Sequence, residues 1–431
     1  MACLATVAAR GADFYVSPSG SDSAPGSRLA PWRTIQKAWD TALPGSTIIL
    51  LPGVYTNAAT TRRDGTSSAS ITLQGEPGAV VGKNLTLQNS HQRVAGLAFQ
   101  RSKLIFLSTN ANWDVVESNV FYNGKGCIGL NNDLPRPYSP VFGPAYDDIR
   151  FNVFSNAYGV HVVLNGGHHD VVESNLFTST TGWDAMRVWG FNQVIRGNIF
   201  TNFTSNLTNS QHTDIIQTFG KNGNEASNIL FGQNWVLNCK GTQLGNLEQD
   251  GVANICDWTF QNNVIANSHA QINIYIPRCN FYNNTFWRCN ANLILQYKSK
   301  PWRKSPKTVE TGTGNVLNNL FIDCGNPPAN PKYGRYSGGR RIWADYNMLA
   351  GPGGSAKNIH ESHGINGGNP RFVNPQALDF RLLPNSPARG RGIPIPGVTN
   401  DITGASRLGA PFGIGAFSYR PLSGPTFNTN H

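Results

Sequence analysis

The sequence predicts an all-β chain folded as a single right-handed parallel β-helix, a solenoid of about ten or more turns with a short N-terminal capping helix. Two observations predict this class: a short motif that recurs through most of the chain, and a composition suited to many tight turns. The 431 residues include 46 Gly and 26 Pro, and 14% are charged. Gly and Asn tolerate the left-handed backbone of such turns, and a hydrophobic fraction of 39% is enough for a core.

The recurring motif is an Asn followed by apolar residues. It occurs nine times, at Asn119, Asn152, Asn175, Asn198, Asn234, Asn263, Asn284, Asn319 and Asn347, in steps of 33, 23, 23, 36, 29, 21, 35 and 28 residues. The short steps suit one solenoid turn of three short strands, and the longer steps suit the same turn carrying a loop. Propeller blades need about 40 residues, and the pattern of leucine-rich repeats is absent from the sequence. We expect each Asn to occupy a left-handed turn, with its side chain bonding along a stack.

The composition of the two chain ends predicts that the chain is divided into three segments. Residues 1–12 are apolar and read as a leader or signal remnant. Residues 13–350 form the β-helix with its N-terminal cap, and residues 351–431 form a Gly/Pro-rich tail packed on the β-helix. Within residues 32–42, one helical face would carry Ile35, Ala38, Trp39 and Ala42. This predicts the capping helix.

Both ends of the chain also resemble a known group of proteins. The resemblance lies in Phe14–Asp22 (FYVSPSGSD), Pro31–Ala38 (PWRTIQKA), Pro52–Tyr55 (PGVY), Asn369–Phe372 (NPRF), Asp379–Leu382 (DFRL), Ser386–Ala388 (SPA) and Gly413–Ala416 (GIGA). These segments resemble secreted bacterial right-handed parallel β-helix proteins, many of which are polysaccharide lyases or glycoside hydrolases. The resemblance implies the fold and a secreted, periplasmic or cell-surface location. The chain matches neither the calcium motifs of pectate lyases nor the Lys/Arg signature of chondroitinase-B-like lyases.

Three of the seven cysteines share one position of the repeat. Cys239, Cys289 and Cys324 each follow a repeat Asn by five residues. Adjacent strands lie about 4.8 Å apart, so Cys289 and Cys324 are within reach of a disulfide. A buried ladder of thiols is the alternative. The spacings of Cys and His do not suit a structural zinc.

The net charge of +11 favours a polyanionic partner. The sequence lacks a basic helix, a zinc-finger spacing or a Lys/Arg stripe, and it lacks an apolar run of the about 20 residues that span a bilayer. We therefore expect an acidic polysaccharide substrate, no nucleic-acid or membrane partner, and a monomer.

One face of the predicted solenoid carries polar and aromatic side chains in register. Alternation along the strands predicts outward columns that would bind a sugar chain through His161, Trp189, Gln217, Phe219, Asn273, Tyr275 and Tyr297, with Lys298 beside them. In this alignment Gly245 and Leu295 complete the polar column, and Val163 and Leu247 the aromatic one. A slip of one residue would exchange the inside and the outside of a strand.

Acidic and basic groups gather over the same turns. The candidate catalytic residues are Asp184, Arg187, His212, Asp214, Glu248 and Asp250. Asp184 and Asp214 precede strands on consecutive turns and should lie near one another. The alternative for each Asp is turn capping.

Two mechanisms compete for this set. In a lyase, Arg187 would neutralise the uronate carboxylate with help from Gln217, and His212, Tyr275 or Lys298 would be the base. Ca²⁺ bound by Asp184, Asp214 and Glu248 could replace Arg187; no cofactor is otherwise expected. In a glycoside hydrolase, two carboxylates flank the bond. Asp184 with Asp214 would suit retention of configuration, and Asp214 with Glu248 or Asp250 would suit inversion. The net charge favours a lyase acting on a uronate-containing polysaccharide by β-elimination. A uronan C5-epimerase and a non-catalytic carbohydrate-binding β-helix are the remaining alternatives.

Overall fold

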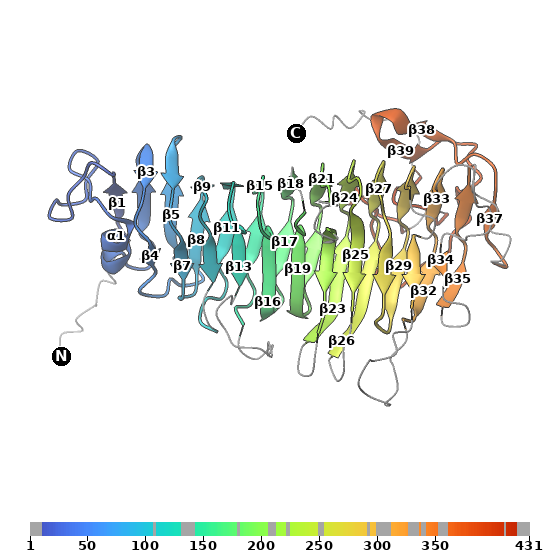
Figure 1. Cartoon of the computed structure of the whole chain (residues 1–431), viewed down its shortest axis with the longest axis horizontal. Coiled ribbons are helices and arrows are strands. Elements are labelled where there is room, and N and C mark those ends of the chain that lie inside the picture. Colours follow the sequence, from blue (N-terminus) through green and yellow to red (C-terminus); the bar gives the residue numbers. More distant parts are fainter. Residues whose placement is uncertain are drawn as a thin grey trace, which may run out of the picture. The chain divides into compact units, whose positions relative to one another are not determined.

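The computed structural model describes residues 11–106, 109–130, 143–178, 182–205, 213–220, 225–248, 254–290, 294–298, 312–325, 336–337, 342–351, 361–408 and 411–419. They form two compact units, one ending at Phe191 and one beginning at Asn192. Each unit consists of short parallel strands (Figure 1), which confirms the predicted parallel β-helix class. Within a turn the chain passes through three ladders of paired strands, which we call sheets 1, 2 and 3.

The first unit has three such sheets. Sheet 1 contains β4 (Ala59–Thr60), β7 (Leu85–Leu87), β10 (Leu104–Phe106), β13 (Ile128–Leu130), β16 (Val162–His168) and β19 (Met186–Phe191). Sheet 2 contains β1 (Asp13–Val16), β2 (Thr47–Leu50), β5 (Ile71–Gly75), β8 (Gln92–Ala95), β11 (Val115–Glu117), β14 (Asp148–Arg150) and β17 (Val171–Glu173). Sheet 3 contains β3 (Gly53–Tyr55), β6 (Ala79–Val81), β9 (Ala98–Gln100), β12 (Val120–Tyr122), β15 (Val153–Ser155) and β18 (Leu176–Thr178).

The second unit repeats this plan. Sheet 1 contains β22 (Asp214–Thr218), β25 (Gln243–Leu247), β28 (Ile272–Ile274), β31 (Leu295–Tyr297) and β34 (Tyr336–Ser337). Sheet 2 contains β20 (Val194–Arg196), β23 (Glu225–Gly232), β26 (Asn254–Gln261), β29 (Cys279–Tyr282), β32 (Gly314–Leu317) and β35 (Ile342–Asp345). Sheet 3 contains β21 (Ile199–Thr201), β24 (Trp235–Leu237), β27 (Val264–Ala266), β30 (Thr285–Trp287), β33 (Leu320–Ile322), β36 (Met348–Ala350) and β37 (Ile365–Asn366).

The N-terminal helix α1 (Ile35–Thr41) packs against β1 and β4. The side chain of Thr34 accepts a hydrogen bond from the backbone N–H of Lys37 and so caps its first turn. Ile35, Ala38 and Trp39 are buried, as the periodicity predicts. The helix is shorter than residues 32–42, because Trp32 forms a β-bridge with Val16 instead. Its role as a cap on the solenoid stays a prediction.

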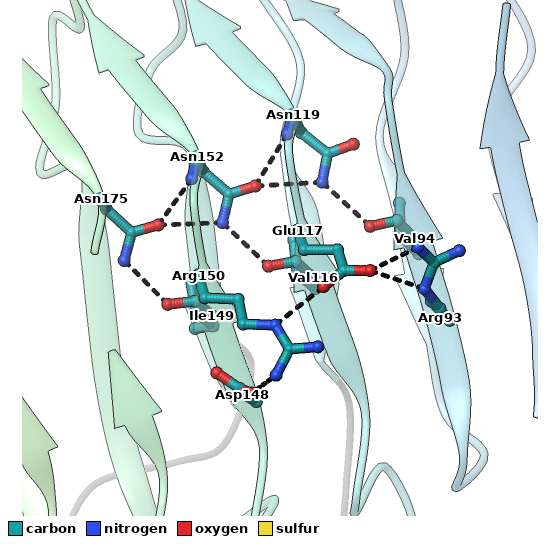
Figure 2. Close-up of polar contacts among 10 residues, drawn as sticks. All are labelled: Arg93, Val94, Val116, Glu117, Asn119, Asp148, Ile149, Arg150, Asn152 and Asn175. Atoms are coloured by element: carbon teal, nitrogen blue, oxygen red, sulfur yellow. Dashed lines mark hydrogen bonds and ion pairs between the residues drawn. The ribbon is translucent and has the colours of Figure 1, made fainter. Parts of the chain in front are cut away.

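The repeat Asn residues form continuous hydrogen-bonded ladders. In the first unit, Oδ1 of Asn152 accepts from the backbone N–H of Asn119 at 3.0 Å and from Nδ2 of Asn119 at 3.1 Å (Figure 2). Oδ1 of Asn175 accepts from the same two groups of Asn152. Each amide also donates to a backbone carbonyl, as Asn119 does to Val94. The pattern continues in the second unit, where Glu361 accepts from the last repeat residue, Asn347. Pairing the buried ladder amides in this way holds adjacent turns in register.

The left-handed residue of each turn is the one before the ladder Asn. Ser118, Phe151 and Ser174 have φ of 57°, 54° and 55°, whereas the Asn that follows each of them is not left-handed. The expectation that the Asn itself takes this conformation is therefore wrong by one residue.

The cysteines of the second unit form a ladder of thiols. Cys239, Cys289 and Cys324 are buried, and none of the three forms a disulfide. Each donates to a carbonyl, for example Cys289 Sγ to Ile265 O at 3.4 Å and Cys324 Sγ to Phe286 O at 3.4 Å. Of the two alternatives, the buried thiol ladder is the one observed.

The C-terminal segment packs on sheet 3 of the second unit, where β38 (Phe372–Asn374) and β39 (Asp379–Leu382) form an antiparallel pair (Figure 1). Phe380 and Ile414 join a cluster with Trp287 and Leu320 from the strands below. The C-terminal segment thereby covers sheet 3, and it also packs on Tyr282 of β29 and Leu317 of β32 in sheet 2. We therefore expect a functional surface on sheet 1 or on the rest of sheet 2.

Candidate functional site

Sheet 1 of the second unit carries a continuous row of four amide side chains. Strand pairing aligns Gln217 of β22 with Asn246 of β25, Asn246 with Asn273 of β28, and Asn273 with Gln296 of β31. The flanking positions in these strands are apolar and buried, among them Ile216, Leu247 and Ile274. The row therefore lies on the outer face, with amide groups about 4.8 Å apart.

Two acceptors in this row have no protein donor within the described part of the chain. Oε1 of Gln217 and Oδ1 of Asn246 are buried and make no hydrogen bond, and each residue is 8% exposed. A buried carbonyl left without a donor costs about 1–3 kcal/mol. Two such oxygens side by side suit hydroxyl donors, which a sugar chain supplies.

Lys298 follows β31 and reaches back over the row. Its Nζ donates to Oδ1 of Asn273 at 2.5 Å and lies 5.7 Å from the centroid of the Tyr275 ring. Partial burial lowers the pKa of Lys298 below its usual 10.5, although the nearby Glu248 carboxylate acts in the opposite direction. Lowering the pKa increases the fraction of neutral amine, the form that can accept a proton.

Asn273 and Glu248 are held by neighbouring amides. Asn273 donates to Oε1 of Gln243 at 2.9 Å and accepts from Nε2 of Gln271 at 3.2 Å. Glu248 accepts from Nδ2 of Asn246 at 3.1 Å. The row, Lys298 and Glu248 together form the surface that we call the amide-row site.

Besides Lys298, four of the predicted substrate-binding residues lie on or next to this surface. Gln217 and Asn273 occupy one row, as the sequence predicts. Tyr275 is half-buried beside Lys298. Phe219 follows β22 and is half-buried.

His161 and Tyr297 do not face outward, contrary to the sequence prediction. His161 of the first unit is fully buried among core rings, 6.3 Å from the centroid of Phe154 and 6.1 Å from that of Phe177. Burial lowers its pKa to about 3, so the imidazole is neutral. Tyr297 is inside the second unit, where its hydroxyl donates to the backbone carbonyl of Cys279 at 2.6 Å. Neither side chain can contact a polysaccharide.

The predicted aromatic column does not form. Leu247 and Tyr297 are aligned through Ile274 within the core, and Trp189 of the first unit is 3% exposed. The predicted alignment was displaced by one residue in β25 and β31, so that Gly245 and Leu295 took the places of Asn246 and Gln296. Loops of different length separate each strand from its ladder Asn, and counting from the Asn therefore loses the register. Matching Asn246 to Asn273 directly would have recovered it.

The described members of the predicted catalytic set fall into different environments. In the first unit, Arg187 Nε donates to Oδ2 of Asp184 at 2.8 Å, so the guanidinium charge is compensated locally. In the second unit, Asp214 is fully buried in β22 and Glu248 is part-exposed. His212 and Asp250 lie outside the described residues. The proximity of Asp184 to Asp214 stays a prediction.

A calcium ion at Asp184, Asp214 and Glu248 was one possibility that the sequence left open. Among the residues that the structure describes, no group of three His, Cys, Asp or Glu side chains is arranged to hold a metal ion. The calcium site stays a prediction, and the reaction proposed for Lys298 does not depend on it.

The comparisons with known proteins point to the same fold. Residues 18–76 match a family described as a protein of unknown function, DUF1565. The chain is 46% identical over 72 residues to a pectate lyase, PEL9, of Emericella nidulans. This match covers 16% of the chain and 18% of the relative, so the chain spans less than a fifth of that protein.

Solved structures resemble the chain over nearly its whole length. A complex of XylC with xylose has a TM-score of 0.57 at 11% identity and covers 94% of this chain and 98% of its own. Pectate lyase Pel9A has a TM-score of 0.53 at 14% identity and covers 96% and 97%. These similarities confirm the resemblance to right-handed parallel β-helix proteins. The described residues include no helix long and apolar enough to cross a membrane.

Proposed function

We propose that the protein is a secreted polysaccharide lyase that cleaves a uronate-containing chain by β-elimination, with Lys298 as the base. The observation that carries the proposal is the placement of Lys298. Its amine is fixed by Asn273 above Tyr275, and its pKa is lowered by partial burial. It lies beside a row of amides that includes two unsatisfied acceptors.

The reaction breaks a C–H bond and a C–O bond of one uronate residue. The Lys298 amine takes the proton from C5, the electron pair forms the C4–C5 double bond, and the bond from C4 to the glycosidic oxygen breaks. The leaving oxygen needs a proton, which the Lys298 ammonium can return, regenerating the neutral amine. A positioned general base contributes about 10²–10⁴-fold to such a rate.

The amide row would bind and orient the sugar chain. Gln217 and Asn246 offer acceptors for hydroxyl groups, and the amide hydrogens of the row can donate to sugar oxygens. The net charge of +11 would raise the local concentration of an acidic polymer. Similarity to lyases of related fold supports this reaction class.

The glycoside hydrolase alternative finds less support. It needs two carboxyl groups flanking the bond. Of the candidates described in the second unit, Asp214 is fully buried, which leaves Glu248 at the surface. A hydrolase would not require an amine with a lowered pKa.

The test is an assay of product chemistry. Purified protein is incubated with polygalacturonate, alginate, glucuronan and neutral glucans, while the ultraviolet absorbance of unsaturated uronate and the number of new reducing ends are followed. We expect both signals to rise together on one acidic substrate. Reducing ends without the absorbance would contradict the lyase and favour a hydrolase. Neither signal on any substrate would also contradict it.

A further inference from the structure

A pocket of about 490 Å³ opens over sheet 2 of the second unit, on strands β26, β29, β32 and β35. Strand pairing aligns Asn315 of β32 with Trp343 of β35, and the backbone N–H of Asn315 donates to the side chain of Asn280 of β29. These residues therefore form one row across the pocket. The amide-row site uses none of them.

Trp343 supplies an apolar wall to this pocket. Its side chain lines the pocket, and the residue is 54% exposed. Trp113 of the first unit is similarly exposed at 51%, but its ring stacks on Tyr146 with centroids 4.1 Å apart and planes 4° apart. No ring contact is recorded for Trp343 among the described residues. A free indole face is the surface on which the C–H groups of a sugar ring pack.

The polar groups of the pocket are fixed before any ligand binds. The backbone N–H of Asn315 donates to Oδ1 of Asn280 at 3.0 Å, and Nδ2 of Asn315 donates to the hydroxyl of Tyr282 at 3.0 Å. Both amide planes are thus oriented, and Oδ1 of Asn315 has no protein donor among the described residues. Preorganised amides reduce the entropy lost when a ligand is bound.

The charged groups of the pocket compensate one another. Arg278 binds Asp257 through two hydrogen bonds, Nε to Oδ1 at 2.5 Å and Nη2 to Oδ2 at 2.8 Å. A bidentate pair satisfies the carboxylate and leaves no net charge for an anionic ligand. The pocket therefore suits a neutral ligand with hydroxyl groups and an apolar ring face.

We propose that this pocket, which we call the Trp343 pocket, binds an uncharged sugar residue of a glycan. The ring packs on the Trp343 indole, and its hydroxyls bond to Asn280 and Asn315. The protein would then hold a neutral glycan on sheet 2 independently of any reaction on sheet 1.

The test is affinity electrophoresis of the full chain in gels that contain xylan, β-glucan, galactomannan or polygalacturonate. The salt concentration is high enough to screen the net positive charge. We expect retardation by at least one neutral glycan and a loss of about ten-fold in its association constant in Trp343→Ala. Asn315→Ala should weaken binding with the aromatic wall left in place. Trp113→Ala is the matched control and should bind as the wild type does.

Three outcomes would overturn the proposal: no neutral glycan retards the protein, Trp343→Ala binds unchanged, or retardation through Trp343 is confined to polygalacturonate. A Trp343→Ala protein with altered circular dichroism would be replaced by Trp343→Leu, which keeps apolar bulk without the aromatic face and should lose binding equally. Lys298→Met should retain the binding, so failure of the lyase proposal and failure of this one are distinguishable.

Discussion

The amide-row site and the Trp343 pocket lie on two sheets of the same unit and differ in how they treat charge. In the amide-row site, the Lys298 amine is partly buried and donates to the Asn273 side chain, and burial lowers its pKa. In the second, Arg278 is exposed and forms two hydrogen bonds with the carboxylate of Asp257. An amine that loses solvent without gaining a full counter-charge becomes a base, whereas a compensated guanidinium stays an inert cation. The difference separates a surface suited to chemistry from one suited to recognition.

The largest effect should come from removing the amine. We expect Lys298→Met to lower kcat by about 10²–10⁴-fold on the acidic substrate, because the general base is lost. Arg278→Met, which removes a cation from the other sheet, should leave kcat unchanged. Lys240→Met, at an exposed lysine of the same unit, is a second control. Equal losses in Lys298→Met and Arg278→Met would remove the distinction between the two surfaces.

The next effect concerns the pKa of Lys298. Asn273→Asp would place a carboxylate at the amine, favour the ammonium and raise the pKa of Lys298 toward its usual value. At a given pH less neutral base is present, so the rising limb of the pH–rate profile should move upward by about one pH unit. Asn273→Ala would remove an acceptor of the ammonium without adding charge, so it should lower the rate without an upward shift of the profile. A profile that is unmoved in Asn273→Asp would show that Lys298 does not titrate in the reaction.

Sequence reasoning recovered the fold well because the repeat is local. The Asn-to-Asn steps count turns directly, and within each unit successive ladder Asn residues bond to one another. The site was recovered in part, since Gln217, Asn273 and Lys298 were identified while Asn246 and Gln296 were displaced by one residue. Register on the outer face depends on loop lengths that vary from turn to turn, and Tyr297 is buried because the pairing of β28 with β31 aligns it with Ile274 in the core. Neither is encoded in the spacing of the motif.

A smaller effect should follow from removing the unsatisfied acceptor, the side-chain carbonyl of Gln217. Gln217→Met keeps the length of the side chain and removes the carbonyl that has no donor. We expect KM to rise by about 5- to 10-fold, as for one neutral hydrogen bond, with kcat little changed. The melting temperature should not fall, because no protein contact of that oxygen is lost. A lower melting temperature with an unchanged KM would show that Oε1 of Gln217 stabilises the fold and does not bind the substrate.

The smallest effect should be a gain in affinity of the Trp343 pocket for an acidic polysaccharide. Asp257→Asn would leave Arg278 uncompensated, so polygalacturonate should retard this variant about two- to three-fold more than the wild type at low salt. The difference should vanish at high salt, and the amide-row activity should not change. No gain in affinity for the acidic polymer would contradict the claim that the ion pair makes this pocket neutral.

The central claim is that the Lys298 amine performs the proton transfer, and chemical rescue tests it most directly. The six cysteines among the described residues are buried, and Cys3, which lies outside them, is replaced by Ser in the background used for this test. The thiol introduced by Lys298→Cys then reacts with 2-bromoethylamine, which rebuilds an amine of nearly the same length. The measurement is the rate of unsaturated uronate formation before and after modification. We predict that the unmodified variant is inactive and that aminoethylation restores a substantial part of the wild-type rate. Full activity before modification, or a folded and fully modified protein that stays inactive, would contradict the account.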